Sequence, residues 1–519
     1  MSLFHKLKGW LNEERLERLP WVVMAYIGGL LAYFALHGQG LYFVIALGLG
    51  TGLLGFWFKK YFGLIGLSVV SFCVGWGNMA FQTFLNAHPI LEHPVYQMPI
   101  EATVWDNQIL TDRQILTLGE IRWQNPDLKM PQKIRVHLKQ ADVFLNTGDR
   151  IKANVHVYPP TQMAGYERQL WFDKIGATGV IQGVTVKHAG SSFAVGNFLR
   201  QKINRYLFRL LPREQAEIAA ALMTGSRKLV SREVYQLYRR AGIAHVLSVS
   251  GFHMALLAAF LFFMIRSLCV LFPRVVFYKN TKKVAAVLAL IGTFLYLGLS
   301  GFQIPAVRAF IMIAFVFAGI LMDRSVLSMR SLWLACLGIL LVAPHKVLSV
   351  SFQLSFVAVM VLVAFCTWLQ EKTWSRFWKF CVGFIGVNGF VYLALSPFVA
   401  YHFHQVIPYG ILGNMVFNGV FSLFIMPLLF VGALFMLFGV GRPFFVLAGY
   451  GIKLVHQGIE GMADWPYAEI VVPEISSSAL SLFAFGLMIL CFMKTPLKRI
   501  GFLFILLGIG WAFLLDLFG

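Results

Sequence analysis

Histidines and serines interrupt an apolar run in the middle of the chain. Residues 242–254 read Gly-Ile-Ala-His-Val-Leu-Ser-Val-Ser-Gly-Phe-His-Met and lead into the purely apolar residues 255–265. Because a bilayer offers no water to polar groups, such side chains occur where they face protein or a water-filled cavity. On an ideal helix these groups would point to several sides, so we expect an unwound or re-entrant entry that lines a path. Its candidate lining residues are His245, Ser248, Ser250, Gly251 and His253. Taken alone, the stretch fits equally well a membrane helix whose polar side chains bind neighbouring helices.

An arginine lies inside a second apolar run. Residues 300–305 read Ser-Gly-Phe-Gln-Ile-Pro and break the chain, and Arg308 follows one turn later. The nearest downstream acid, Asp323, is about 22 Å away along a helix, so the guanidinium has no expected partner in its own span. A phosphate would satisfy such a guanidinium. The alternatives are that Arg308 caps the broken helix end or extends to the membrane surface.

Amides and a hydroxyl recur at membrane depth along the same half of the chain. Gln303 lies in the break, Gln353 and Ser355 lie in the segment 351–356, and Asn414 lies in a later apolar run. We interpret these four residues as further lining of the path. Hydrogen bonding between helices is the alternative for each of them.

Carboxylates are nearly absent from this half of the chain. Between Glu233 and Glu371 the sequence has one acid, Asp323, and between Glu371 and Glu460 it has none. A proton- or sodium-coupled carrier usually needs a carboxylate near the midplane, so this class is disfavoured. The six cysteines form no Cys-x-x-Cys or Cys/His ligand pattern, and we expect no disulfide framework, no metal site and no cofactor.

The composition is that of a membrane protein with many spans. The chain has 519 residues, of which 58% are hydrophobic and 13% charged, with a mean hydropathy of +0.71 and a net charge of +21. Its apolar runs predict about thirteen transmembrane helices, three of them before residue 86. The positive-inside rule places the N-terminus in the cytoplasm and the C-terminus outside it.

A single long polar region follows the first three spans. Residues 86–195 alternate as strands do at 101–110, 113–123, 133–140, 150–158 and 178–188, with a short helical insert at 166–174. Five such strands predict an extracytoplasmic β-barrel of the OB type. Its charge is nearly balanced, which weakens an electrostatic argument for binding single strands here.

Basic residues dominate the next segment, residues 196–242. We name its candidate phosphate-binding cations the collar: Arg200, Arg205, Arg209, Arg227, Lys228, Arg232, Arg239 and Arg240. On the outer side the positive-inside rule does not require them, so they suit a polyanion that approaches the membrane. Helices lying on anionic lipid headgroups are the alternative. The predicted domains are thus residues 1–85, with a cytoplasmic N-terminal segment and three spans, the barrel at 86–195, the basic helices at 196–242 and a channel domain at 243–519.

Several motifs in the same order resemble the ComEC competence proteins. They are residues 221–225 (Ala-Leu-Met-Thr-Gly), 245–253, the break at 300–302 with Pro305 and Arg308, and 351–356 (Ser-Phe-Gln-Leu-Ser-Phe). In the barrel, residues 148–150 and 174–179 are similar to the family's OB-fold pattern. The resemblance implies an inner-membrane channel that passes single-stranded DNA into the cytoplasm during natural transformation. The implied partners are membrane lipids, a periplasmic or surface DNA receptor, a cytoplasmic helicase or translocase, and a possible separate nuclease.

One feature of longer relatives is missing from this sequence. Their metallo-β-lactamase-like domain carries a His-x-His-x-Asp-His cluster, whereas the chain's only His-x-His, His402 and His404, lacks the Asp-His that would follow. We therefore expect no nuclease activity and no enzyme, since metal-dependent cleavage needs such ligands. The competing function is a carrier or flippase for a small or lipid-linked anion.

Overall fold

The structure is a computed structural model, and its helices and strands fall into two compact units. It describes residues 18–36, 63–109, 114–123, 131–138, 145, 148–160, 171–188, 194–226, 229–247, 249, 251–270, 280–302, 304–323, 329–436, 438–493, 496 and 498–518. One unit comprises Met1–Met24, Arg200–Ile339 and Val350–Gly519, and the other comprises Ala25–Leu199 and Leu340–Ser349. The predicted span at residues 41–58 lies outside the described residues.

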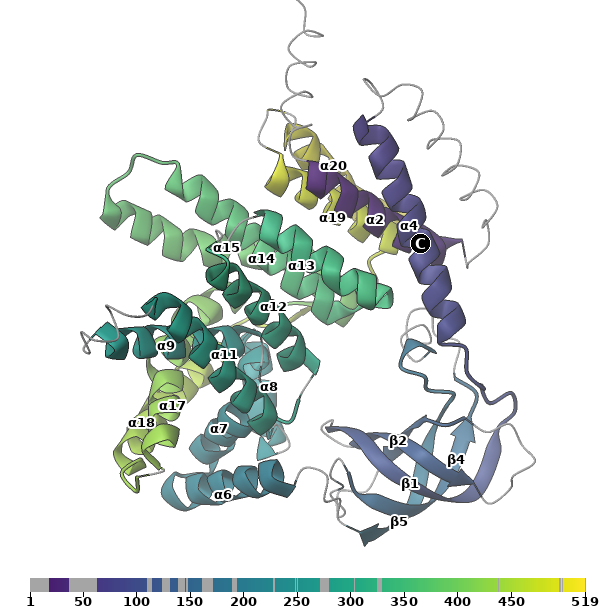
Figure 1. Cartoon of the computed structure of the whole chain (residues 1–519), viewed down its shortest axis with the longest axis vertical. Coiled ribbons are helices and arrows are strands. Elements are labelled where there is room, and N and C mark those ends of the chain that lie inside the picture. Colours follow the sequence, from purple (N-terminus) through teal and green to yellow (C-terminus); the bar gives the residue numbers. More distant parts are fainter. Residues whose placement is uncertain are drawn as a thin grey trace, which may run out of the picture. The chain divides into compact units, whose positions relative to one another are not determined.

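A closed five-stranded barrel forms most of the smaller unit (Figure 1). Its strands are β1 (Val95–Ile109), β2 (Gln114–Trp123), β3 (Ile134–Leu138), β4 (Arg150–Tyr158) and β5 (Ala177–His188). Their order around the barrel is β1-β2-β3-β5-β4, and β3 and β5 pair in parallel whereas the other neighbours are antiparallel. The predicted five-stranded barrel is confirmed, and its strand order is compatible with the OB type. Most of the predicted helical insert lies outside the described residues.

The barrel closes because its strands alternate between apolar and polar residues. Along β4, Ile151, Ala153, Val155 and Val157 are buried, and the residues between them face outward. The inward residues of all five strands form one apolar cluster, as expected when side chains fill a small barrel.

Two N-terminal helices, α2 (Arg18–Ala35) and α4 (Gly63–Leu85), approach each other closely. A β-carbon on Gly29 would lie 2.0 Å from the carbonyl oxygen of Phe72, and one on Gly75 would lie 2.2 Å from that of Tyr26. Only glycine permits this contact, which is how small residues stabilise helix pairs in lipid. The Asn78 amide then donates to the carbonyl oxygens of Leu340 and Leu341, which lie at the end of α13 (Met329–Val342).

The larger unit is helical. It begins with α6 (Ala194–Leu210), α7 (Arg213–Thr224), α8 (Arg232–Arg240) and the 3₁₀ turn η2 (Ala244–Leu247). It continues with α9 (Gly251–Val270), α11 (Thr281–Leu299), α12 (Ile304–Leu321), α13, the 3₁₀ turn η3 (Pro344–Leu348, in the smaller unit), α14 (Val350–Gln370) and α15 (Arg376–Phe403). It closes with α16 (Gly410–Gly413), the π-helical segments η4 (Asn414–Asn418) and η5 (Phe421–Ile425), α17 (Met426–Met436), α18 (Arg442–Ala463), α19 (Ser477–Phe492) and α20 (Lys498–Phe518). A two-stranded ribbon joins β6 (Gln405–Val406) to β7 (Ile470–Val471).

Five helices of the described part are long and apolar enough to cross a membrane. They cover His253–Val270, Thr281–Leu299, Val350–Gln370, Arg376–Phe403 and Gly410–Met436, and shorter apolar helices accompany them. The helix pair α14 and α15 runs side by side (Figure 1). The chain is therefore a membrane protein with several candidate spans, while the predicted number of about thirteen is not confirmed.

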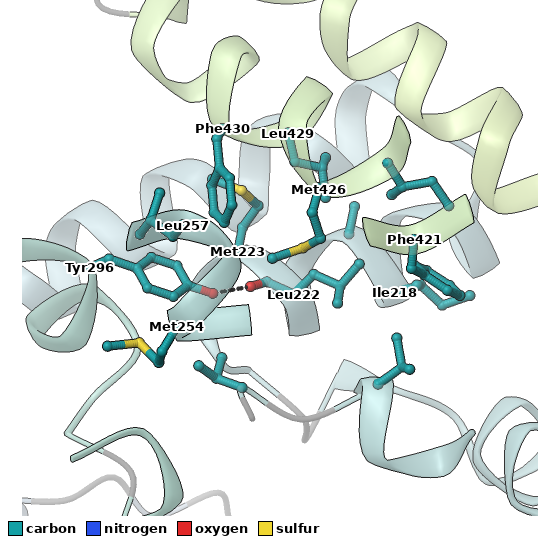
Figure 2. Close-up of a cluster of buried hydrophobic side chains, with 14 of the residues drawn as sticks. Ile218, Leu222, Met223, Met254, Leu257, Tyr296, Phe421, Met426, Leu429 and Phe430 are labelled. Carbon is teal, nitrogen blue, oxygen red and sulfur yellow. Dashed lines mark hydrogen bonds between the residues drawn. The ribbon is translucent and has the colours of Figure 1, made fainter. Parts of the chain in front are cut away.

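One apolar core, part of which Figure 2 shows, is shared by α6, α7, α8, α9, α11, α12, α17 and α18 with the short segments η2 and η5. Ile218, Leu222 and Met223 of α7 pack with Met254 and Leu257 of α9 and with Phe421, Met426, Leu429 and Phe430 further along the chain. Alanines and other small residues let α7 enter this core, and all residues from Ala216 to Thr224 are buried. The helix α7 is therefore part of the core, and the described collar cations lie on α6 and α8 instead.

Candidate functional site

The histidine- and serine-rich entry is not a continuous helix. The 3₁₀ turn η2 carries His245, and α9 begins only at Gly251. Of its candidate lining residues, His245 and Gly251 are exposed and His253 is buried with 1% of its surface accessible. Ser248 and Ser250 lie outside the described residues. His245 and His253 therefore lie in different surroundings although they are close in the sequence.

Three motifs meet around this entry. A β-carbon on Gly251 would lie 3.4 Å from Cβ of Ala309, so the start of α9 packs against α12. Gly242 has a φ of +73°, and a β-carbon on it would lie 2.8 Å from Cα of Gly410. A β-carbon on Gly413 would lie 2.3 Å from the carbonyl oxygen of Ala241. These approaches bring the entry, the helix that carries Arg308 and the segment that carries Asn414 into one neighbourhood.

The predicted break before Arg308 is present between α11 and α12. Ser300 is buried, Gly301 has a φ of +85° and Phe302 a φ of +51°. Gln303 lies outside the described residues, and the backbone of Arg308 belongs to the second turn of α12. The geometry places Arg308 on the helix that packs against the start of α9.

The segment with Asn414 is wound unusually. Residues Asn414–Asn418 and Phe421–Ile425 form π-helical turns, which in other proteins occur often at functional sites. The Asn414 amide donates to the carbonyl oxygen of Gly410 at 2.7 Å, so this side chain bonds its own helix. Its proposed place on the path depends on the close contact of Gly410 with the entry.

Gln353 has a partner that sequence reasoning missed. Its Oε1 lies 2.8 Å from Nε2 of His402, which joins α14 to α15, while Ser355 is exposed. From the sequence alone, His402 is only half of an incomplete metal motif. The two residues are separated by 49 positions, and no local pattern announces such a pair.

The collar cations differ in their surroundings. Arg205, Arg209, Arg232, Arg239 and Arg240 are exposed, Arg200 is half-buried, and Arg227 and Lys228 lie outside the described residues. Arg239 donates to Glu469 at 2.6 Å and to Gln405 at 2.5 Å, which fastens α8 to the ribbon of β6 and β7. Burial lowers the pKa of Arg200.

A polar pocket of about 170 Å³ opens between α7 and α18. Its walls include Glu214, Lys453, His456 and Glu460, and Nε2 of His456 lies 3.5 Å from one carboxylate oxygen of each glutamate. Among the residues that the structure describes, no group of three or more His, Cys, Asp or Glu could hold a metal ion.

The sequence profile of a family described as Competence protein matches residues 222–497, from the last turn of α7 to just beyond α19. This is more than half of the chain, and the chain belongs to this family of competence proteins. All of the predicted lining residues fall inside the matched region.

Individual relatives agree with this assignment. The chain is 28% identical to ComE operon protein 3 of Bacillus subtilis over 56% of its length and 36% of the relative's. It is 24% identical to Recombination protein 2 of Haemophilus influenzae over 68% and 42% of the two chains. It is 27% identical to Competence protein ComA of Neisseria gonorrhoeae over 42% and 32%. The chain therefore spans about two-fifths or less of the relatives' length in each match. No solved structure matches it.

Proposed function

We propose that this protein is an inner-membrane channel that passes single-stranded DNA into the cytoplasm during natural transformation. The observation that carries the proposal is the match of residues 222–497 to the competence proteins, because this region holds the entry, the α11–α12 break and the π-helical segment that pack together. The names of two relatives, Recombination protein 2 and Competence protein ComA, support the proposal.

The proposed path has an outer and an inner part. Exposed collar arginines on α6 and α8 gather the phosphate backbone, which attracts cations whatever the base sequence. The entry and the start of α12 then receive the strand where polar groups lie within an apolar bundle, with His245, Arg308 and Asn414 as lining residues. Gln353 and Ser355 continue the lining on α14, and His402 holds the amide of Gln353.

The barrel guides the strand outside the membrane in this proposal. Small barrels of this strand order use rim aromatic residues to stack bases. Tyr96 is 62% exposed and is available for such contacts, whereas the ring of Trp105 packs on Gly119 and beneath the ammonium of Lys133. The N-terminus is proposed to lie in the cytoplasm, and the partners are a surface or periplasmic DNA receptor, a cytoplasmic helicase or translocase and a separate nuclease.

A complementation experiment tests the proposal. A strain without the gene is transformed with genomic DNA after receiving the wild-type gene or the Arg308→Ala variant, and the membrane abundance of both proteins is measured. The proposal expects no transformants in the deletion strain and no rescue by Arg308→Ala at normal abundance. Normal transformation of the deletion strain would contradict it and favour a carrier of a small anion, which would show saturable solute transport without any dependence on DNA.

A further inference from the structure

One collar arginine is bound to the turn between α11 and α12. Nη2 of Arg200 on α6 donates to the carbonyl oxygen of Gly298 at 3.2 Å. Gly298 lies in the last turn of α11, where a cation is favoured by the helix dipole, and its carbonyl oxygen also accepts from the N–H of Gly301 at 3.2 Å. Arg200 therefore adds a charged side-chain donor to a carbonyl oxygen that the turn itself already bonds, and this bond joins α6 to the turn.

The same guanidinium packs on the glycine of the turn. A β-carbon on Gly301 would lie 3.2 Å from Nη1, 3.3 Å from Cζ and 3.3 Å from Nη2 of Arg200. These nearly equal distances place the plane of the guanidinium face-on to Gly301. A planar group that donates at its edge and packs by its face is an arginine property that the compact ammonium of lysine does not share.

The turn determines how α12 begins. After Ser300, Gly301 and Phe302, all of positive φ or buried, the helix starts at Ile304 and presents Ala309 to the start of α9. A second contact on the same side, from the hydroxyl of Tyr296 to the carbonyl oxygen of Leu222 at 2.6 Å, joins α11 to α7. The α6–α7 hairpin thus holds α11 at two points.

We propose that Arg200 is a positioning residue that locks the turn Ser300–Phe302 against α6 and so fixes the start of α12. Among the described collar residues, the five exposed arginines attract phosphate by their charge, whereas Arg200 holds the turn in place. The inference rests on the proposed function only in its consequence, because α12 carries Arg308 of the proposed path. The lock itself is a structural statement that does not depend on DNA.

Labelling of a buried position measures the lock directly. The full chain, with its six native cysteines replaced and Ser300→Cys introduced, is purified in detergent and its reaction rate with a maleimide is followed. Ser300 is 2% exposed, so the reaction is slow when the turn is closed. Arg200→Gln and Arg200→Lys are expected to speed labelling by about tenfold, the factor that corresponds to one hydrogen bond to a charged group. Arg205→Gln, which removes an exposed charge from the same helix, leaves the rate unchanged. Equal rates in all four proteins overturn the inference.

A second variant protects the test against loss of folding. Gly301→Ala keeps Arg200 but adds a methyl group where the guanidinium lies, in a backbone conformation that alanine disfavours. It is expected to speed labelling as Arg200→Gln does, and combining both changes should add little. Rates that add independently would overturn the inference.

Transformation then separates the lock from the channel. Arg200→Lys, which keeps the charge, is expected to lower transformation as much as Arg200→Gln. Faster labelling with normal transformation supports the lock and contradicts the role of α12 in the DNA path. Unchanged labelling overturns the lock whatever the transformation frequency.

Discussion

Removing the hydroxyl of Tyr296 should destabilise the larger unit without changing its packing. Tyr296 is 6% exposed and its hydroxyl donates to the carbonyl oxygen of Leu222, in the last turn of α7 (Figure 2). That carbonyl belongs to the helix end that has no partner within the helix. In Tyr296→Phe the ring still packs edge-on against Phe430 at 5.6 Å, so the lost interaction is the hydrogen bond alone.

The expected cost follows from the burial of the group left behind. A buried carbonyl without a donor costs about 1–3 kcal/mol, which is about 5–150-fold in the folding equilibrium. The assay is thermal or denaturant unfolding of the detergent-solubilised full chain, and Tyr450→Phe, 62% exposed on α18, is the matched control. A lower midpoint is expected for Tyr296→Phe and an unchanged one for Tyr450→Phe. Equal midpoints would refute the reasoning that this bond fastens α7 to α11.

Three further predictions concern the path, the lining pair and the barrel unit. Replacing the exposed collar cations Arg205, Arg209, Arg232 and Arg240 together by Gln should lower transformation by about tenfold or more at normal abundance. The reason is that phosphate contacts dominate DNA affinity. The control Glu233→Gln should not lower transformation. His402→Phe should lower transformation as Gln353→Leu does, since either change breaks the bond between the two side chains. A double variant that transforms no worse than either single variant is the expected result, and additive losses would contradict the pairing. Burial, with a smaller contribution from Lys346, lowers the pKa of His345 to about 4, so the unfolded chain binds this proton first and stability falls as pH drops from about 6.5 to 4. His345→Phe, which keeps a ring against Phe172, should flatten the unfolding midpoint of the protein over that pH range, and an unchanged slope would contradict the assignment.

The barrel could be predicted from sequence because its signal is local. Alternation along residues 150–158 fixes both the strand and its inward face, and the structure shows that register. The start of β1 was predicted six residues too late. Pro99 lies in that segment, and proline removes a donor and argues against a strand even where, as here, the chain pairs with β4.

Five candidate spans and the break before α12 were also accessible, since apolar length and a Ser-Gly-Phe-Gln-Ile-Pro sequence are local properties. Pairings over long separations were not. Arg200 with Gly298, Tyr296 with Leu222 and Gln353 with His402 are 98, 74 and 49 positions apart. Each depends on which helices become neighbours, and composition carries no such information. For that reason the sequence does not distinguish Arg200 from the exposed collar cations, although its surroundings differ.

The most direct measurement of the central claim follows the DNA itself. Competent cells of a deletion strain, with and without the wild-type gene, receive fluorescent DNA that carries a selectable marker, and the DNA is located on either side of the inner membrane while transformants are counted. The channel account predicts that without the protein DNA collects outside the inner membrane and no transformants appear, and that the wild-type gene restores both entry and transformation. DNA reaching the cytoplasm of the deletion strain at the normal rate would contradict it.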